Sequence, residues 1–163
     1  GVADKVYGAA KVAVESKGQD MVDKCCIVGS TWVFGVNGKN FVKTMLNLAK
    51  THDTLTVVDD QIGSPTYTAD LARLLVDMIV TDKYGAYHAT NEGICTWYEF
   101  ACEIFKQAGV DIKVTPVTSE AFKTKAKRPL NSRMSKEALT ANGFKKLPTW
   151  QNALSEYLRL IEN

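Results

Sequence analysis

Short apolar runs alternate with longer segments of helical periodicity along this chain, and this alternation limits the fold more than any other feature. Strands are expected at residues 24–28, 55–58, 86–89 and 112–117. Helices are expected at residues 6–15, 41–50, 69–80, 97–107, 135–141 and 150–161. Strands that alternate with helices are typical of an α/β architecture with a largely parallel sheet.

Capping residues support four of these helices. Asn40, Thr68 and Thr149 stand directly before apolar-periodic segments, where a side-chain oxygen can accept the unpaired backbone N–H groups of the first turn. Thr96 and Glu99 are spaced as a capping box, in which each side chain accepts a hydrogen bond from the backbone of the other residue. These four helices are therefore expected to begin directly after residues 40, 68, 96 and 149.

The net charge of +2 conceals a basic segment within an acidic chain. Residues 113–146 contain nine Lys or Arg side chains and two Glu side chains, a balance of +7, and the remainder has a balance of −5. Such a segment suits an anionic ligand such as a phosphate, or it is a solvated, lysine-rich surface loop. Nucleic acid is disfavoured, because no aromatic residues interleave with the basic side chains at a recognisable spacing.

Length and cysteine content indicate one reduced globular domain, or a piece of a larger one. The chain has 163 residues, of which 45% are hydrophobic, and this is enough for a core without disulfides. Its four cysteines include no Cys-x-x-Cys pair, and its two histidines do not complete a zinc site with them. No apolar run approaches the roughly 20 residues of a membrane span. We expect a cytoplasmic protein with reduced thiols, no metal and no membrane contact.

Tyr7 and Lys11 form a Tyr-x-x-x-Lys pair within the first expected helix. Residues four positions apart share a helix face, so the phenol and the ammonium group point into the same space. A nearby positive charge lowers the pKa of a phenol, ordinarily about 10, and such a phenol can give a proton to a carbonyl oxygen. The spacing alone is common in helices, and a surface pair without chemistry is the alternative interpretation.

Seven ordered sequence blocks place this pair in a wider context. They are YGAAK at 7–11, STWVFG at 30–35, GKNFVKTM at 38–45, VDDQIGSPT at 58–66, HATNEGICTWYEF at 88–100, AKRP at 126–129 and LPTW at 147–150. Together they resemble the dTDP-4-dehydrorhamnose reductase family, which belongs to the extended short-chain dehydrogenases/reductases. The resemblance implies a Rossmann-like α/β fold, with the C-terminal part of a doubly wound sheet and the smaller substrate-binding α/β region.

The resemblance implies a catalytic dyad. Tyr7 matches the family's catalytic tyrosine, which protonates the C4 oxygen of dTDP-6-deoxy-L-lyxo-4-hexulose (dTDP-4-dehydro-L-rhamnose) as NADPH or NADH reduces it to dTDP-L-rhamnose. Lys11 matches the lysine that lowers the pKa of this tyrosine and hydrogen-bonds the nicotinamide ribose. Both residues are therefore expected to serve catalysis and cofactor binding.

Two further residues are implied in substrate binding. Trp32 matches an aromatic residue that contacts the deoxysugar, a role suited to a flat apolar ring with an N–H at its edge. The alternative for Trp32 is a core or lid tryptophan. Arg128 matches a position near the nucleotide diphosphate, which a guanidinium binds in a bidentate manner, or it is a solvated arginine.

Of two further loops, one is expected to lie at the substrate cleft and the other to have no chemical role. Residues 61–66, with Gly63 and Pro65 as turn residues, are expected to form the loop beside the substrate cleft. Residues 91–93 are interpreted as a plain turn without chemistry.

The chain departs from the family pattern in two places. It lacks the Gly-rich turn on which a dinucleotide pyrophosphate rests, and the nearest candidate, Gly35-Val36-Asn37-Gly38, has no third glycine. Residues 1–163 therefore correspond to the C-terminal, substrate-binding portion of a reductase, without the N-terminal dinucleotide-binding part. Gly29-Ser30 also stands before Thr31-Trp32, where the family usually has Arg-Thr before its Ser-Trp.

Three functions follow from this reasoning. The first is an NAD(P)-dependent oxidoreductase portion that binds a dTDP-sugar but binds NADPH poorly and turns over little by itself. The second is a non-catalytic regulatory or binding subunit on the same scaffold, and the third is a related nucleotide-sugar reductase or epimerase. Because the strand at 24–28 would have an unpaired edge, we expect a homodimer or a complementary N-terminal segment as its partner.

Overall fold

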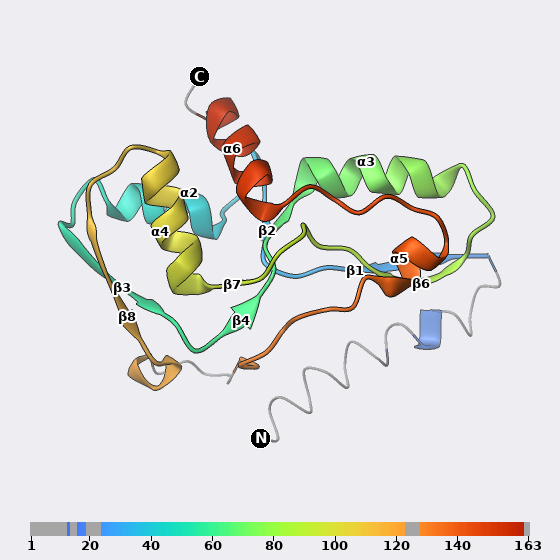
Figure 1. The fold of residues 1–163 in the computed structure, drawn as a ribbon, viewed down its shortest axis with the longest axis horizontal. Coiled ribbons are helices and arrows are strands. Elements are labelled where there is room, and N and C mark those ends of the chain that lie inside the picture. The colour runs from blue at the N-terminus through green and yellow to red at the C-terminus, as the bar shows by residue number, and fades with distance from the viewer. Residues whose placement is uncertain (1–12, 14–15, 19–23, 123–127, 162–163) are drawn as a thin grey trace.

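The computed structural model describes residue 13 and residues 16–18, 24–122 and 128–161, and these form an α/β fold (Figure 1). The strands are β1 (Cys26–Gly29), β2 (Val33–Phe34), β3 (Thr54–Val58), β4 (Ile62–Gly63), β5 (Thr66–Tyr67), β6 (Gly85–His88), β7 (Cys95–Thr96) and β8 (Lys113–Val117). The helices are α2 (Phe41–Leu48), α3 (Thr68–Ile79), α4 (Trp97–Gln107), α5 (Glu137–Ala141), α6 (Trp150–Ile161) and the single 3₁₀ turn η1 (Ser119–Ala121). The expected helix at 6–15 lies mostly outside the described residues.

The described strands pair as four two-stranded sheets. β1 with β6, β2 with β5 and β3 with β8 are parallel pairs, whereas β4 with β7 is antiparallel. The expectation of largely parallel pairing is confirmed. The four strands expected from the sequence are present within two residues of their expected bounds. The pairs β2–β5 and β4–β7 join segments that are each only two residues long, which is too short for a periodic signal.

The caps at Asn40 and Thr96 are confirmed. Asn40 accepts a hydrogen bond from the backbone of Lys43 at 3.0 Å, and Thr96 and Glu99 form both bonds of a capping box. Thr68 was wrongly expected to cap α3: it is the first residue of the helix, and the N-cap position is Tyr67, whose side chain caps nothing. The N–H of Tyr67 instead bonds to a side chain from a distant loop, described below.

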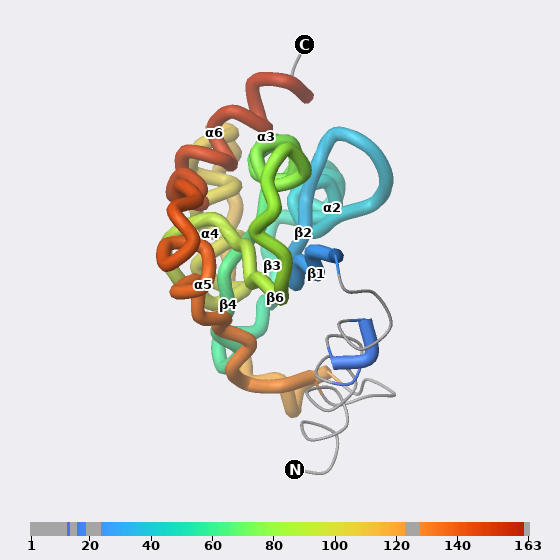
Figure 2. The backbone as a smooth tube through the Cα atoms, turned by 90° about the vertical axis from the view of Figure 1, so that its right-hand side faces the viewer, coloured from blue at the N-terminus to red at the C-terminus, as the bar shows by residue number. Residues whose placement is uncertain are grey.

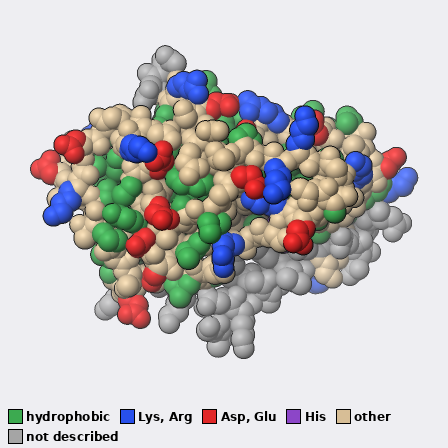
Figure 3. Space-filling view, in the orientation of Figure 1, with side chains coloured by type: hydrophobic (Ala, Val, Ile, Leu, Met, Phe, Trp, Pro, Cys, Tyr) green, Lys and Arg blue, Asp and Glu red, His purple; other side chains and the backbone are tan. Residues whose placement is uncertain are grey.

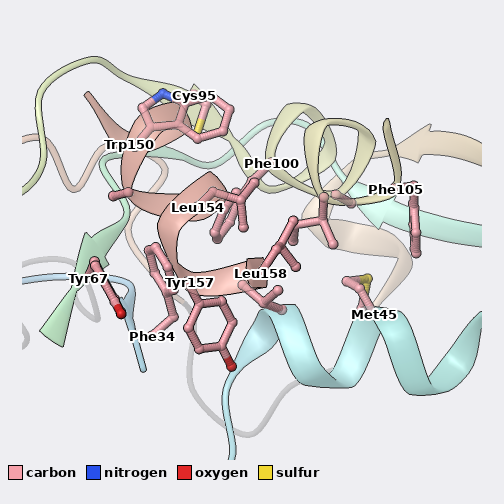
Figure 4. Packing of buried hydrophobic residues seen from close by; sticks show 14 of the residues in the cluster. Phe34, Met45, Tyr67, Cys95, Phe100, Phe105, Trp150, Leu154, Tyr157 and Leu158 are labelled. Atoms are coloured by element: carbon pink, nitrogen blue, oxygen red, sulfur yellow. The ribbon is translucent and has the colours of Figure 1, made fainter. Parts of the chain in front are cut away.

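The larger core lies between α2, α4 and α6, as the side chains of Figure 4 show. Phe34 is at its centre, with Tyr67 stacked at 5.4 Å and Tyr157 edge-on at 5.3 Å between ring centroids. Leu154 and Ile104 are fully buried beside them. This cluster contains side chains from α4, α6 and the strands β2 and β5. It therefore fixes the segment between β1 and β2, which leads into β2, against the helices.

A second, smaller core lies between α3, α5 and the β1–β6 pair. It contains Leu74 and Met78 from α3, Tyr87 from β6 and Leu139 from α5. Figure 2 shows α5 and α6 along one side of the molecule and α2 with β1 on the other, with β3 and β6 between them. The run at 24–28 was expected to be a buried strand, but the residues of β1 are only half-buried or exposed, because among the described strands β1 pairs with β6 alone.

Candidate functional site

Trp32 occupies the link between β1 and β2 in a backbone conformation that is rare for a residue with a side chain. Its φ is +49°, within the left-handed region, and it is the only described non-glycine residue with positive φ. Left-handed geometry costs an L-residue about 1–2 kcal/mol, so it persists only where the surroundings enforce it. Such strain concentrates at binding sites, which makes Trp32 the first residue to examine.

Hydrogen bonds from the loop at 64–66 enforce this backbone. The Trp32 carbonyl accepts the N–H of Thr66 at 3.1 Å. The Thr66 hydroxyl donates to the carbonyl of Thr31 at 2.7 Å, and the Thr31 hydroxyl donates to the carbonyl of Ser64 at 3.2 Å. Thr31, Ser64 and Thr66 are all buried, so these bonds are shielded from water. The segment at 61–66, which was expected to be a loop, instead contains β4 and the first residue of β5, and it holds Trp32 directly.

The indole of Trp32 stacks on a second tryptophan. The ring centroids of Trp32 and Trp97 are 3.7 Å apart, and the ring planes differ by 13°. Phe41 packs on Trp97 with 4.7 Å between ring centroids, and it also stacks on Phe100 with 5.5 Å between ring centroids. Trp32 thus lies at the end of a continuous group of aromatic rings that extends into the core, and its side chain is only half-buried.

The segment that contains Arg128 runs beside the same loop. The N–H of Ile62 donates to the carbonyl of Leu130 at 2.8 Å, and the N–H of Ser132 donates to the carbonyl of Ile62 at 2.9 Å. Arg128 itself is exposed, two residues before this contact. The structure therefore brings the basic segment to β4, next to the loop that holds Trp32, and leaves the guanidinium in solvent. Tyr7 and Lys11 lie outside the described residues.

Part of the basic segment is neutralised within the chain. Lys136 forms an ion pair with Glu92 at 2.6 Å, and Lys146 reaches the same carboxylate at 3.5 Å. Partial burial by itself raises the pKa of Glu92, but the two ammonium groups outweigh burial and hold it below its ordinary value. These two lysines are therefore engaged with Glu92 and contribute little to binding an external anion.

The sequence suggests that Asn91 belongs to a plain turn, but the structure gives its side chain several long-range hydrogen bonds. Its side chain is fully buried, accepts the N–H of Tyr67 at 2.8 Å, and donates to Asp70 at 2.7 Å and to the carbonyl of Pro148 at 3.0 Å. Its own N–H donates to the carbonyl of Pro65 at 3.2 Å. Asn91 therefore joins the loop around Trp32 to the start of α3 and the approach to α6. No local pattern signals this, because every partner is at least 21 residues away.

The candidate dinucleotide turn at residues 35–38 does not fit a pyrophosphate. The carbonyls of Val36 and Gly38 accept the ammonium group of Lys43, and the carbonyl of Gly35 accepts the amide of Asn40 at 2.8 Å. A pyrophosphate rests on a Gly-rich turn with a third glycine at a helix N-terminus, and this irregular segment between β2 and α2 lacks that glycine.

Two surface grooves lie away from Trp32. One, of about 470 Å³, is lined by Leu46, Val110 and Ile161 with Lys43 and Lys50. The other, of about 460 Å³, lies between α4 and the start of α6, where Figure 3 shows hydrophobic side chains mixed with charged ones. Cys95 lines it, but burial, aided by the charge of Glu99, raises the pKa of this thiol to about 12. The thiol is therefore protonated at neutral pH and is a poor nucleophile.

The described residues contain no group of three or more His, Cys, Asp or Glu side chains that could hold a metal ion. Across the same part of the chain, no helix has the length and apolar character needed to cross a membrane.

Comparison with known proteins identifies relatives along nearly the whole chain. The spore coat polysaccharide biosynthesis protein SpsK of Bacillus subtilis is 41% identical, over 94% of this chain and 54% of the relative. The dTDP-4-dehydrorhamnose reductase of Aggregatibacter actinomycetemcomitans is also 41% identical, over 91% of this chain and 55% of the relative. The chain thus spans about half the length of the curated relatives it matches.

Solved structures show the same pattern. A dTDP-4-dehydrorhamnose reductase from Clostridium acetobutylicum superposes with a TM-score of 0.91 at 44% identity, over 96% of this chain and 56% of that one. The reductase from Bacillus anthracis, solved in complex with NADP, gives a TM-score of 0.88 at 42% identity, over 95% of this chain and 55% of that one. These matches confirm the resemblance and the α/β fold.

The model of the RmlD substrate binding domain matches residues 4–162, and this range contains Trp32, Gly63, Asn91 and Arg128. On this match, and on the relatives and structures above, the chain belongs to the RmlD substrate-binding domain family.

Proposed function

We propose that this chain is the substrate-binding and proton-donating portion of an NAD(P)H-dependent dTDP-4-dehydrorhamnose reductase. The observation that supports it most is the match to reductases of known structure at 42–44% identity, which extends over at least 95% of the chain. The backbone of Trp32 adds support, because a strained aromatic residue at a half-buried position is typical of a binding site.

Each implied residue has one task in this proposal. Tyr7 donates a proton to the C4 oxygen of dTDP-4-dehydro-L-rhamnose, and Lys11 stabilises the phenolate that remains. Trp32 offers the part of its half-buried indole that Trp97 and Gly63 leave exposed to the deoxysugar, where an indole makes apolar contact and donates a hydrogen bond from its edge. Arg128 binds the diphosphate, for which its exposed guanidinium is free to move.

In this proposal, tight binding of the cofactor depends on residues outside this chain. NADPH or NADH supplies the hydride, and the loop at 35–38 does not fit its pyrophosphate. The matched reductases are almost twice as long as this chain, and one of them was solved with NADP. We therefore propose that residues 1–163 bind the dTDP-sugar, bind NADPH poorly and turn over little or nothing by themselves.

Two measurements on the purified chain test this proposal. Calorimetric titration with dTDP-L-rhamnose should show binding that Trp32→Ala weakens, and equal affinities would remove Trp32 from the site. Mixing the chain with NADPH and dTDP-4-dehydro-L-rhamnose should leave NADPH absorbance unchanged. Oxidation of NADPH by the pure chain would overturn the proposed inactivity, and no binding of any dTDP-sugar would overturn the proposed substrate class.

A related reductase is the alternative with a specific observation in its favour. A relative from Streptomyces niveus, named as a dTDP-4-keto-6-deoxy-D-glucose reductase, is 34% identical over 95% of this chain and 54% of the relative. Titration with dTDP-6-deoxy-D-hexoses beside dTDP-L-rhamnose separates the two, because the correct sugar should bind more tightly. A non-catalytic subunit would bind neither sugar in a manner that depends on Trp32.

The partner and the compartment are also proposals. In the described part of the chain β1 pairs with β6 alone, which supports a further strand at its other edge, from a second copy or from a complementary N-terminal segment. All four cysteines are free thiols, which supports a reducing, cytoplasmic environment. A monodisperse monomer by sedimentation, without response to a dye for exposed hydrophobic surface, would argue against any such partner.

A further inference from the structure

Trp97 covers one face of the Trp32 indole. A centroid separation of 3.7 Å with nearly parallel planes is face-to-face contact, so nothing else can occupy that face. Any ligand of Trp32 must therefore contact the ring elsewhere than on this face. The orientation of Trp97 decides which way the remaining surface of the ring points.

Trp97 is itself firmly placed. It is the first residue of α4 and lies within the capping box, between the N-cap Thr96 and Glu99, so its backbone is fixed by a closed helix terminus. Its ring contacts Phe41 from α2 at 4.7 Å and Phe100 from the next turn at 6.4 Å. The platform under Trp32 is therefore built from two helices.

Gly63 lies against the face of the same indole that Trp97 does not cover. A Cβ at this position would stand 2.6 Å from Cε2 and 2.8 Å from Cζ2 of Trp32, far inside contact distance. The φ angle of Gly63 is not positive, so its backbone conformation does not require glycine. The glycine is required by the close approach of the Trp32 ring and of Ser132, whose Oγ would also stand 2.6 Å from a Cβ at this position, and this distinguishes it from an ordinary turn glycine.

We propose that Trp97 and Gly63 are positioning residues that hold the Trp32 indole from its two faces, so that the exposed part of the ring contacts the hexose ring of a nucleotide sugar. This inference rests on the proposed function and deepens it, because it assigns sugar recognition to the three residues acting together. Trp97 and Gly63 act through Trp32 and contact no nucleotide in this arrangement. Changes at either position should weaken binding of the sugar-bearing nucleotide and leave binding of dTDP unchanged.

The test combines binding with a spectroscopic readout of the ring pair. Two indoles stacked at this distance couple their electronic transitions, so the wild-type chain should show an exciton couplet in circular dichroism. Trp32→Leu and Trp97→Leu should each abolish the couplet. Trp150→Phe is the matched control, because Trp150 is the third tryptophan of the chain and packs on Phe100 instead of on Trp32. It should keep the couplet.

Calorimetry with dTDP-L-rhamnose and with dTDP then measures the consequence. Trp97→Leu should lower affinity for dTDP-L-rhamnose about tenfold, the factor that corresponds to the loss of one well-placed aromatic contact. Trp97→Phe should restore most of it, and affinity for dTDP should stay constant in all variants. In a Trp32→Leu background, Trp97→Leu should have no further effect, since its role is exercised through Trp32.

Gly63→Ala gives an independent arm. In the wild-type background it should lower affinity for dTDP-L-rhamnose and alter the couplet, because the methyl group displaces the ring. In a Trp32→Ala background the same substitution should have little further effect, because the clashing ring is gone and the remaining close atom, the Oγ of Ser132, is the end of a side chain that can rotate away.

The outcomes separate the inference from the function it rests on. Wild-type chain that keeps the couplet but binds no dTDP-sugar would overturn the proposed function. Sugar-dependent binding that Trp97→Leu and Gly63→Ala leave intact would overturn the positioning role alone. Equal losses of dTDP and dTDP-L-rhamnose affinity would mean a general structural role, and would also overturn the inference.

Discussion

The region around α4 and α6 encloses most of its apolar residues, whereas the layer of β1, β6 and α3 leaves apolar surface open. In the first region Phe34, Leu154 and Tyr157 are at most 1% exposed. In the second, Leu74 and Met78 on the inner face of α3 are buried, but Val76 and Ile79 on its outer face are 61% and 76% exposed.

This difference indicates which helices have their apolar faces covered within the chain and which do not. A helix that packs one face on a core needs a single apolar stripe, and further apolar residues around its circumference indicate a second contact. α6 follows the single-stripe pattern, whereas α3 carries both the buried stripe and the exposed Leu75, Val76 and Ile79, and the exposed Val80 caps its end. The sequence of α3 thus fits a helix between two layers, and the open edge of β1 lies in the same region.

Leu154→Ala should break the enclosed region with the largest effect on stability. Leu154 is fully buried, so its truncation leaves a cavity and should lower the free energy of unfolding by about 2–5 kcal/mol. Urea denaturation followed by fluorescence measures this. Leu160→Ala, in the same helix at a position 54% exposed, is the matched control and should cost less than about 0.5 kcal/mol. Equal losses from the two variants would contradict an enclosed core.

Asn91→Ala should weaken the connection between the two regions. It removes three side-chain hydrogen bonds, leaves the buried N–H of Tyr67 without its side-chain acceptor, and leaves the carboxylate of Asp70 with Arg73 as its remaining side-chain partner. The expected loss is about 1–3 kcal/mol in the same denaturation experiment. Asn142→Ala removes an exposed amide that bonds to the carbonyl of Ala138, and should be nearly neutral. If Asn91→Ala left the free energy of unfolding unchanged, the side-chain hydrogen bonds of Asn91 would not be needed to connect the two regions.

Glu92 should give the molecule a small acid sensitivity. Its folded-state pKa lies below the unfolded value, so its ion pairs stabilise the protein above about pH 4.5 and are lost as the pH falls further. Glu92→Gln should therefore cost less than about 1 kcal/mol at pH 7, and the difference from wild type should shrink below pH 4.5. Glu120→Gln, at an exposed position, is the control. A constant difference across this range would exclude the carboxylate as its source.

Val76→Lys combined with Ile79→Lys tests the open region with the smallest effect on stability. Both side chains are exposed, so the free energy of unfolding should change by no more than about 0.5 kcal/mol. The response to a dye for hydrophobic surface should fall, and any dimer seen by sedimentation should weaken. Asp77→Lys adds the same net charge on the same helix and should do neither. If the dye response persists, the exposed apolar surface lies at β1 instead.

Features set by neighbouring residues were predictable from the sequence. The caps at Asn40 and Thr96 depend on residues three positions away, and both are confirmed. The expected cap at Thr68 was wrong by one residue, because the N–H of Tyr67 is bonded by Asn91, which lies 24 residues further along the chain. The two-residue strands escaped the periodic signal for a related reason, since Val33 pairs with Thr66 across a long connection.

The candidate site divides in the same manner. Trp32 and Arg128 were identified by resemblance, and the position of Trp32 at a strained, half-buried link supports its assignment. Trp97 was visible only as part of a helix start, Gly63 only as a turn residue, and Asn91 was misinterpreted as a plain turn. Their roles arise from contacts with a ring or a loop that is distant in sequence.

The sequence by itself determined the alternation of strands and helices, most helix starts, the basic segment and the resemblance to nucleotide-sugar reductases, because each depends on local order or on motifs. Only the tertiary structure decided that Trp97 and Gly63 enclose Trp32, that Asn91 joins two cores, and that Glu92 neutralises part of the basic segment. These depend on which distant residues are brought within a few ångströms, and packing fixes that proximity whereas local patterns do not.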